Sequence, residues 1–381
     1  MRPDPRICHL TSAHIAADAR IFYRELLSLR KVYDDVHLVA CTETPEAVVQ
    51  GIHVYGHGPR RNPLCRVGTL RRMYRQAVAL QADIYHAHEP DSWLVAYLAA
   101  RRVGARFVLD AHELHHETFR EQHAGLVPRG IAWGVKRLTK YLAPRADLLV
   151  TVTESVADIL RRDFGARRPL VLYNAPWPTP RERLPNKSPQ AVAFVGGMAM
   201  DRGMDVLLHA LALVRRRLPI TLIWAGKVLE NEERLWQDLV RARGLEKAVR
   251  FLGFVPAPDL AAAVGMAPIG MQLDRPTVNN LNGIGSKQFT YMDACMAQVA
   301  RDFPETTRMV RAHEAGLVVG PPFSAEQYAD AILYLLEHLD ETSRMGLNGR
   351  RALEEQYGWH LMEPKLLEAY EELVSRAASG Q

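Results

Sequence analysis

Cysteine is scarce in this sequence, and uninterrupted apolar runs of membrane-spanning length are absent. The four cysteines are widely spaced and form no CxxC pair, which argues against a disulfide scaffold or a zinc knuckle and fits a reducing compartment. The longest mainly apolar stretch, residues 260–273, is interrupted by glycine, proline and glutamine, so it does not suit a membrane helix. The first twenty residues lack the apolar core and cleavage site of a secretory signal. We therefore expect a cytoplasmic protein.

Positive charge is concentrated in the first half of the chain. Residues 1–175 carry a formal charge of +7, and residues 176–381 carry −2. A basic half would attract an anionic ligand or a phospholipid surface, although a solvated arginine-rich surface explains the same charge. Nucleic acid is not expected as a partner, because the basic residues are dispersed and no recognised binding motif is present.

Short β-branched or apolar runs alternate with longer amphipathic stretches along the chain. This alternation is typical of right-handed βαβ units, whose parallel sheets are buried on both faces. Helices are expected between most strands, including residues 21–30 and 91–102. The predicted strands are residues 6–11, 36–41, 52–55, 84–88, 107–112, 148–152 and 170–173 in the first half, and 192–196, 221–225, 249–254, 269–273, 298–302 and 316–319 in the second.

A proline-rich segment separates the two halves. Residues 174–189 contain five prolines, and because proline fixes φ and lacks a backbone donor, neither a helix nor a central strand can continue through them. We predict a Rossmann-like domain at residues 1–175, a linker at 176–190 and a second Rossmann-like domain at 191–357. Doubly wound sheets bind ligands beyond the carboxyl ends of their strands. The two domains are therefore expected to face a central cleft.

Two glycine turns in the second half suit phosphate groups. In residues 191–208, Gly196 and Gly197 follow a strand, and Arg202 precedes a helix. The glycines would let a phosphate approach the backbone, and the guanidinium would pair with its charge. The spacing is not GxGxxG, so a plain strand-to-helix turn is an equally simple explanation.

The second turn, NNLNGIGSK at residues 279–287, precedes a helix predicted at 288–295. Backbone amides at the start of that helix would point at an anion, with a lysine beside them. The residues concerned are Gly283, Gly285, Ser286 and Lys287. Two such turns in one domain, each with a cation, favour a diphosphate over a single phosphate.

Histidines and carboxylates gather at the ends of predicted strands in the first half. Several polar side chains facing one crevice are typical of a binding site, and imidazoles can donate hydrogen bonds to sugar hydroxyls or phosphate. The histidines are His14, His86, His88 and His112, and the charged residues near them are Asp18, Arg20, Glu89, Asp110 and Glu113. Two of these have simpler explanations, since Asp18 would cap a helix and Arg20 would pair with a neighbouring carboxylate.

The sequence HELHH at residues 112–116 matches the HExxH pattern of zinc hydrolases. That chemistry requires both histidines on one helical face, whereas His112 directly follows a predicted strand. No acidic DxD triplet suits a metal–diphosphate clamp either. We therefore expect no metal in the active site.

With these residues identified, the chain resembles glycosyltransferase family 4, whose members are retaining enzymes of the GT-B fold. The resemblance extends over nearly the whole chain. It includes SAHIAADARIFYREL, DIYHAHEPDSWLVAYLAARRVGARFVLDAHEL, ADLLVTVTESVADIL, Asn-x-Pro at 174–176, FVGGMAMDRG and the final YGWHLMEPKLLEAYEEL. The first of these is similar to a branch with an N-terminal His-x3-Asp-x-Arg-Ile-Phe pattern. The resemblance implies that a terminal helix at 358–381 crosses back to the first domain.

The resemblance also implies roles for individual residues. His112 corresponds to a histidine that touches the donor sugar, and Arg202 and Lys287 would stabilise the leaving diphosphate. The first domain would hold the acceptor near His14, Asp18, Arg20, His88, Glu89 and Glu113. Donor contacts would come from Gly196, Gly197, Asn282, Gly283, Gly285, Ser286, Thr290 and Phe254. No cofactor is implied beyond a UDP-, GDP- or dTDP-linked sugar as co-substrate.

Two positions around the second turn depart from the family pattern. The family has two glutamates eight residues apart around the second turn, and the later one holds the donor ribose; this chain has Asn282 and Thr290 there. Threonine cannot accept two hydroxyl hydrogen bonds as a carboxylate does. The loss of that contact would cost about 1–3 kcal/mol of donor binding, which leaves altered donor choice and lost activity both open.

These observations and the resemblance predict a cytoplasmic retaining glycosyltransferase, and the basic first half suits a location at the inner face of the cell membrane. Its acceptor would be a sugar, a lipid-linked sugar or a small molecule of surface polysaccharide, glycolipid or natural-product biosynthesis. The alternative is an inactive GT-B subunit that serves as scaffold or activator of a partner transferase. A nucleotide-sugar epimerase is disfavoured, because its acid and base carboxylates are not evident.

Overall fold

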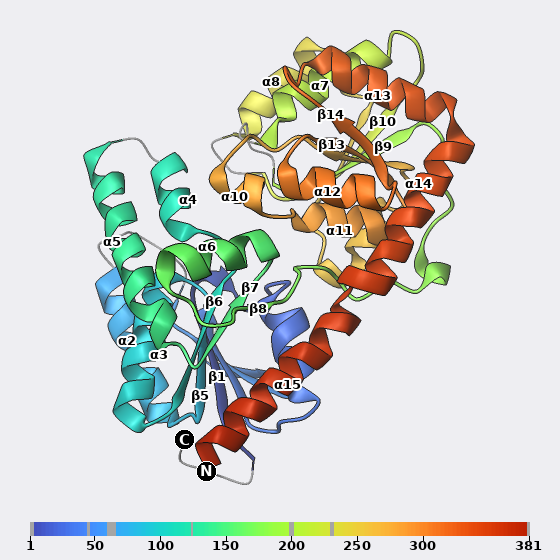
Figure 1. Cartoon of the computed structure of the whole chain (residues 1–381). Coiled ribbons are helices and arrows are strands. Elements are labelled where there is room, and N and C mark those ends of the chain that lie inside the picture. The colour runs from blue at the N-terminus through green and yellow to red at the C-terminus, as the bar shows by residue number, and fades with distance from the viewer. Residues whose placement is uncertain are drawn as a thin grey trace. The chain divides into compact units, whose positions relative to one another are not determined.

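Each half of the chain is built around one parallel β-sheet (Figure 1). The computed structural model describes residues 4–43, 46–58, 66–122, 125–197, 202–228 and 232–378. The chain divides into two compact units, which are described separately here. The first comprises Met1–Tyr173 with Met362–Gln381, and the second comprises Asn174–Leu361.

The first unit has an eight-stranded sheet in the order β3-β4-β2-β1-β5-β6-β7-β8. Its neighbouring strands are parallel apart from the antiparallel pair β3 and β4. The strands are β1 (Ile7–Ile15), β2 (Val36–Cys41), β3 (Glu46–Val49), β4 (Ile52–Gly56), β5 (Ile84–Ala87), β6 (Arg106–Ala111), β7 (Leu148–Thr151) and β8 (Leu170–Val171).

Helices cover both faces of this sheet, with α2 and α3 on one side and α15 on the other (Figure 1). Successive side chains of a strand point to opposite faces. On β5, the Tyr85 hydroxyl donates to the carbonyl of Ala77 in α2, whereas His86 lies 2.7 Å from the Tyr370 hydroxyl of α15. The helices are a π-helix (Ile21–Leu26), α1 (Leu27–Arg30), α2 (Arg66–Leu80), α3 (Pro90–Val103), α4 (His115–Gln122), α5 (Leu126–Leu142), α6 (Glu154–Phe164) and α15 (Trp359–Ala378).

The helix predicted at residues 21–30 begins as a π-helix. The Glu25 amide donates to the carbonyl of Arg20, five residues earlier, at 3.0 Å. The wider turn brings both side chains inward, so that Arg20 is 4% exposed and Glu25 is fully buried. π-Helical turns are uncommon and frequently occur at functional sites.

The second unit has a six-stranded parallel sheet in the order β11-β10-β9-β12-β13-β14. The order reverses between β9 and β12, which is where doubly wound sheets bind ligands. The strands are β9 (Ala191–Val195), β10 (Thr221–Ala225), β11 (Val249–Gly253), β12 (Ile269–Gln272), β13 (Ala297–Arg301) and β14 (Gly316–Val319). The helices are α7 (Met204–Val214), α8 (Glu233–Ala242), α9 (Leu260–Val264), α10 (Val278–Asn282), α11 (Ser286–Asp293), α12 (Pro304–Ala312), α13 (Ala325–Glu337), α14 (Leu339–Ala352) and a π-helix (Leu353–Tyr357).

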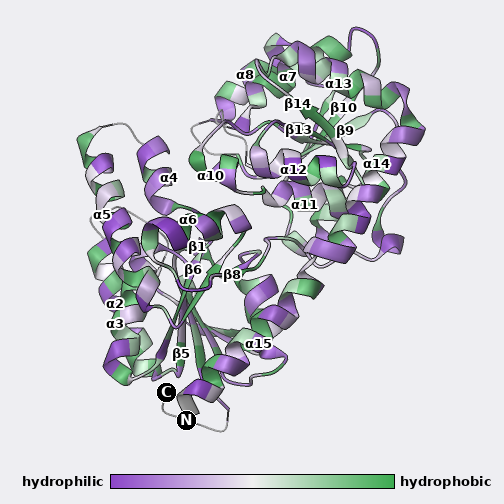
Figure 2. Ribbon diagram, in the orientation of Figure 1, coloured by the Kyte–Doolittle hydropathy of each residue, from purple (hydrophilic) through white to green (hydrophobic). Residues whose placement is uncertain are grey.

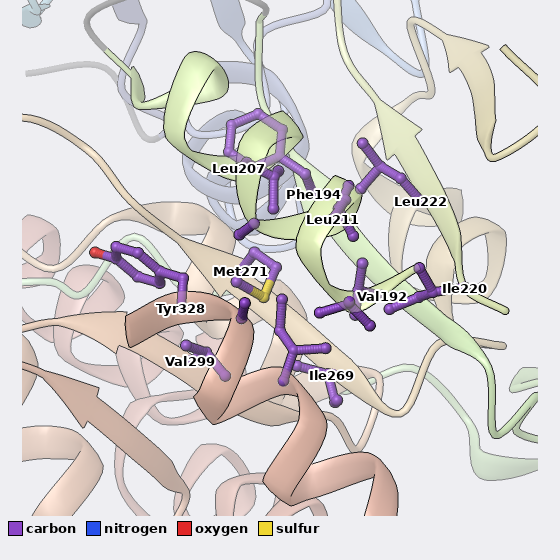
Figure 3. Packing of buried hydrophobic residues seen from close by; sticks show 14 of the residues in the cluster. Val192, Phe194, Leu207, Leu211, Ile220, Leu222, Ile269, Met271, Val299 and Tyr328 are labelled. Atoms are coloured by element: carbon purple, nitrogen blue, oxygen red, sulfur yellow. The ribbon is translucent and has the colours of Figure 1, made fainter. Parts of the chain in front are cut away.

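The core of the second unit lies between the sheet and the helices α7 and α13. Figure 3 shows Val192 and Phe194 of β9 packed with Leu207 and Leu211 of α7 and with Met271 of β12. These side chains are almost completely buried, and burial of apolar surface is the main stabilising contribution to such a core. Figure 2 shows the same pattern in both units, with hydrophobic strands inside and hydrophilic residues on the outer helix faces.

The proline-rich segment lies within the second unit and is tied to it by hydrogen bonds. The ammonium of Lys187 donates to three backbone carbonyls, those of Gly265, Ala267 and Ala294. The Thr179 hydroxyl and amide both donate to Asp293 at 2.7 Å. In this segment the structure has one short 3-10 helix, Arg181–Arg183, and no strand.

The predicted α/β architecture is confirmed, including strands whose limits coincide with those expected at 36–41, 221–225 and 316–319. Strand β3 was not predicted, and β1 continues four residues beyond the expected strand, to Ile15. Among the residues that the structure describes, no helix combines the length and the apolar character needed to cross a bilayer.

Candidate functional site

The edge of the second sheet at the carboxyl ends of its strands has three glycines. Gly196 and Gly197 follow β9, and Gly226 follows β10. A side chain at Gly226 would place its Cβ 1.8 Å from the carbonyl oxygen of Gly196, and Gly196 itself has a φ of +136°. Only glycine permits both the close approach and this backbone conformation. The glycines therefore let the turns after β9 and β10 pack closely against each other.

Arg202 lies beside the same turn. A Cβ built on Gly196 would lie 2.8 Å from Arg202 Nη1, and the arginine is exposed. Residues 198–201, the middle of the predicted phosphate-binding segment, lie outside the described residues. Arg202 thus presents a guanidinium next to the Gly196 backbone, as an anion site requires.

Lys287 lies in the first turn of α11 and is buried against the same strand edge. Its ammonium is 2.7 and 2.8 Å from the two carboxylate oxygens of Asp274, which follows β12. It also lies 4.8 Å from the centre of the Phe194 ring. The Lys287 side chain is only 6% exposed, so this ion pair holds the ammonium in place.

The start of α11 has the geometry of a helix that can receive an anion. Gly285 is its N-cap residue, and the Gly285 amide donates to the Gln288 side chain at 3.2 Å. Ser286 is the first residue of the helix, and its amide belongs to the group that has no intrahelical acceptor. Gly283 ends α10 in an extended conformation and connects the two helices.

The two positions that depart from the family pattern make local hydrogen bonds. The Thr290 hydroxyl donates to the carbonyl of Ser286 at 3.3 Å, one turn earlier in the same helix. The side-chain amide of Asn282 donates to the carbonyl of Val278 at 2.8 Å. Thr290 is 7% exposed. Its side chain carries a hydroxyl group, so this position offers no carboxylate.

Aromatic side chains lie at the ends of β10 and β11. Phe254 is 56% exposed, and the ammonium of Lys227 lies 4.7 Å from the centre of its ring. Trp224 and Phe251 pack together with their ring centres 4.2 Å apart. An exposed aromatic face beside a cation can stack on a heterocyclic base.

In the first unit, His14 and Glu89 form a close ion pair at the ends of β1 and β5. The imidazole Nδ1 lies 2.5 Å from Glu89 Oε1, and the Thr11 hydroxyl and the Ser12 amide also donate to that carboxylate. Burial lowers the pKa of His14, but the hydrogen bond and charge of Glu89 outweigh burial and raise it to about 9. Burial raises the pKa of Glu89, and His14 more than reverses this effect. The pair is therefore ionised at neutral pH.

Asp18 and Arg20 have the simpler roles considered from the sequence. The Asp18 carboxylate accepts hydrogen bonds from the amides of Arg20 and Ile21, at 2.8 and 3.0 Å. Arg20 donates to Asp110 at 2.9 Å and to the carbonyl of Leu172 at 3.1 Å. Both residues thus shape the interior below the strand ends.

His112 and Glu113 follow β6 near His14. The rings of His112 and His14 are 5.3 Å apart, and burial lowers the pKa of His112 to about 4. Burial would raise the pKa of Glu113, but its contact with His115 at 2.8 Å lowers it to about 2. Helix α4 begins only at His115, so the two histidines of the HExxH pattern, His112 and His116, do not lie on one helix.

His88 lies deeper than expected for a residue that meets an acceptor. It is fully buried, with Nδ1 3.2 Å from Asp110 and Nε2 facing His9 at 3.1 Å. Burial lowers the pKa of His88, but Asp110 outweighs burial and raises it. His88 therefore belongs to a buried polar cluster beneath Glu89.

Comparison with known proteins identifies the two halves. Residues 19–175 match the model of Glycosyltransferase Family 4, and residues 189–338 match the model of Glycosyl transferases group 1. The chain carries the two domains of a GT-B glycosyltransferase. The predicted GT-B fold class is thereby confirmed.

Individual relatives are distant. The glycogen synthase of Mycobacterium tuberculosis is 28% identical over 193 residues, which cover 49% of this chain and 45% of the relative, so the match spans less than half of that protein. The structure of sucrose-phosphate synthase from Thermosynechococcus elongatus has a TM-score of 0.77 at 15% identity and covers 97% of this chain and 99% of that one. The structure of the Anabaena protein HepE in complex with UDP-glucose has a TM-score of 0.73 at 16% identity, with 97% and 100% covered.

Several polar residues in these GT-B domains were not predicted from the sequence. Asp274 pairs with Lys287, and the guanidinium of Arg301 lies 3.3 Å from the Asp274 carbonyl and 3.9 Å from the ring of Phe323. In the first unit, Glu25 joins the buried polar cluster. Asp274 and Arg301 both lie at the carboxyl ends of predicted strands, which is the signal that could have identified them.

Proposed function

We propose that this chain is a retaining glycosyltransferase that moves a sugar from a nucleoside diphosphate to an acceptor. The observation that supports this most strongly is the group of anion-binding elements at the sheet edge between β9 and β12. The Gly196 turn, Arg202 and the Lys287–Asp274 pair all lie there, and helix α11 begins at the same edge. Two cations and the backbone amides at a helix start suit a diphosphate better than a neutral ligand.

In the proposed mechanism, this group stabilises the leaving nucleoside diphosphate. Negative charge develops on the diphosphate as the glycosidic bond breaks, and Arg202, Lys287 and the amides at the start of α11 would stabilise that charge. The acceptor hydroxyl attacks from the same face, and its proton passes to the departing phosphate. The exposed Phe254 and the nearby Lys227 are proposed to contact the base.

The proposal assigns the acceptor and the sugar to residues of the first unit. The low pKa of His112 keeps it neutral, so its imidazole can hydrogen-bond a sugar hydroxyl without introducing a charge. The His14–Glu89 pair and Glu113 provide charged groups for a polar acceptor. We infer that the chain belongs to the family 4 branch with the His-x3-Asp-x-Arg-Ile-Phe pattern, in which the acceptor belongs to surface polysaccharide, glycolipid or natural-product biosynthesis.

The test is to measure binding and turnover of a panel of UDP-, GDP- and dTDP-sugars. UDP-glucose is the first choice, because HepE was solved with that ligand. We expect one nucleoside diphosphate to bind in calorimetry and the matching sugar nucleotide to be hydrolysed slowly without an acceptor. If no nucleoside diphosphate binds to the folded protein, the proposal is wrong.

A second candidate is an inactive GT-B subunit that supports a partner transferase, and Thr290 is the observation that favours it. Its hydroxyl bonds within its own helix and offers no carboxylate for a ribose. The substitution Thr290→Glu should tighten nucleoside diphosphate binding about tenfold if a ribose lies here. Donor binding without any turnover, in both the wild type and this variant, would favour the subunit over the enzyme.

We also propose that the first unit contacts an anionic membrane surface at the inner face of the cell membrane through α5. Leu126, Val127 and Trp133 are 84%, 74% and 63% exposed on this helix. Basic residues accompany them, and the guanidinium of Arg137 lies 4.9 Å from the Trp133 ring centre. Apolar side chains beside basic ones are typical of helices that lie in a membrane interface. A lipid-linked acceptor would be reached from such a position.

A further inference from the structure

The face of the first sheet beneath the strand ends contains a buried cluster of three histidines and one glutamate. His9 lies on β1 opposite His86 on β5, so both side chains point to the same face of the sheet. His88 follows two residues later and shares that face. Glu25 reaches the cluster from the π-helix Ile21–Leu26. All four side chains are completely buried.

The inner atoms of the cluster all lie within 4.8 Å of one another. Glu25 Oε2 lies 3.8 Å from His9 Nδ1, 3.9 Å from His86 Nε2 and 3.9 Å from His88 Nε2. His9 Nδ1 and His88 Nε2 are 3.1 Å apart. In a tetrahedral zinc site with bonds of about 2.0–2.1 Å, neighbouring ligand atoms are about 3.3–3.4 Å apart. The observed separations bracket that value.

The outer nitrogens of the same histidines have their own partners. His9 Nε2 and His86 Nδ1 lie 3.1 and 2.7 Å from the hydroxyl of Tyr370 on α15. His88 Nδ1 lies 3.2 Å from Asp110. Metal-binding histidines characteristically donate the second ring N–H to a carboxylate or another oxygen, which turns the remaining lone pair toward the ion.

Hydrogen bonding among these residues alone does not satisfy the cluster. A chain of N–H and O–H donors can run from His86 through Tyr370 to His9 and on to His88. This chain of hydrogen bonds leaves His86 Nε2 and both oxygens of Glu25 without a hydrogen bond, and these atoms are buried. Arg20 Nε lies 3.0 Å from Glu25 Oε1, whereas the histidines approach the other oxygen, Oε2. Buried polar atoms without partners are costly.

We propose that His9, His86, His88 and Glu25 bind a divalent transition-metal ion, with zinc as the expected metal. Imidazole nitrogens and one carboxylate form a ligand set that zinc accepts. All four ligands come from the protein and none is exposed, which is typical of a structural site rather than a catalytic one. The ion would connect β1, β5 and the π-helix directly below Glu89, and it would be separate from the diphosphate site.

The test uses the full-length protein, free of any affinity tag, grown with zinc in the medium. After dialysis, elemental analysis should find about one zinc per chain, and titration of the chelator-treated protein with Zn²⁺ or Co²⁺ should restore one equivalent. Removal of the metal should lower the melting temperature, and its return should raise it, because a ligand that binds only the folded state stabilises that state. The absorption spectrum of the Co²⁺ form should be that of a four-coordinate ion.

Two variants and one control locate the ion. Glu25→Gln should lose the metal, and Tyr370→Phe, which removes one hydroxyl behind two ligands, should weaken metal affinity 10- to 100-fold in a folded protein. His53→Gln is the control, since His53 pairs with His37 on the opposite face of the same sheet. A folded wild type that takes up neither metal would overturn the proposal, as would a Glu25→Gln variant that retains the wild-type zinc content and affinity.

Discussion

Lys287 and Asp274 form a largely buried ion pair in which the ammonium contacts both carboxylate oxygens. The pair holds the lysine at the sheet edge where the diphosphate is proposed to bind, and the lysine can contribute to both donor affinity and stability. A substitution of Lys287 alone does not separate these two effects.

We predict that Lys287→Met destabilises the protein by about 3 kcal/mol, because it leaves the Asp274 carboxylate buried without a partner. The double variant Lys287→Met with Asp274→Asn should recover most of that stability but should not recover nucleoside diphosphate binding. Chemical denaturation measures the first quantity and calorimetry measures the second. Recovery of donor binding in the double variant would show that Lys287 is not a diphosphate ligand.

Arg202 allows a cleaner test of the diphosphate site, since it is exposed. Arg202→Ala should weaken nucleoside diphosphate binding about tenfold to a hundredfold, which corresponds to the loss of one or two hydrogen bonds to a charged group. The melting temperature should not change. Arg216→Ala, an exposed arginine after α7, is the matched control and should bind like the wild type.

The His14–Glu89 pair predicts a pH dependence of stability. The folded-state pKa of His14, about 9, lies above its usual value of 6.5, so the stabilising contribution is complete below pH 6.5 and is lost as the pH rises through 9. After allowance for the partial exposure of the imidazole, we expect a loss of about 1–2 kcal/mol over that interval.

The measurement is the unfolding free energy of the wild type and of His14→Gln between pH 6 and pH 10. The variant should lack the decrease that the wild type shows in that range. Equal slopes in the two proteins would mean that His14 is not protonated in the folded state at neutral pH.

The apolar surface of α5 predicts binding to lipid. Leu126→Ser combined with Trp133→Ala should reduce sedimentation with phosphatidylglycerol vesicles more than tenfold, because each buried side chain contributes about 1.5–3 kcal/mol. Leu347→Ser, which alters an exposed leucine on α14, should have no effect. If the wild-type protein does not sediment with these vesicles at low salt, the membrane contact is excluded.

The sequence was sufficient to predict most strands because buried parallel strands are short runs of β-branched and apolar residues bounded by turns. Strand β2, VHLVAC, shows this pattern and was predicted at its observed limits. Strand β3, EAVV, is largely exposed and pairs antiparallel at the sheet edge, so burial does not impose the same pattern on its sequence. The π-helix was missed because its apolar spacing resembles that of the α-helix predicted there.

Candidate site residues could be named from the sequence only where polar residues follow strands or glycine turns. His14, Glu89, Lys287 and Arg202 are candidates of this kind. The partners that fix the positions of these side chains come from distant parts of the chain, and the local sequence does not predict them. Tyr370 is the clearest case, because its hydroxyl contacts His9 across 361 positions of sequence.

That contact has a consequence for biosynthesis. The first unit includes α15, which follows the second unit in the sequence. The strands of the first sheet are therefore translated well before this helix. Domains tend to fold in the order in which they are synthesised, but here the second unit can complete its fold first. Until Tyr370 arrives, the buried histidines lack one of their partners and the apolar surface under α15 stays exposed. The first unit therefore reaches its final packing only after α15 has been translated.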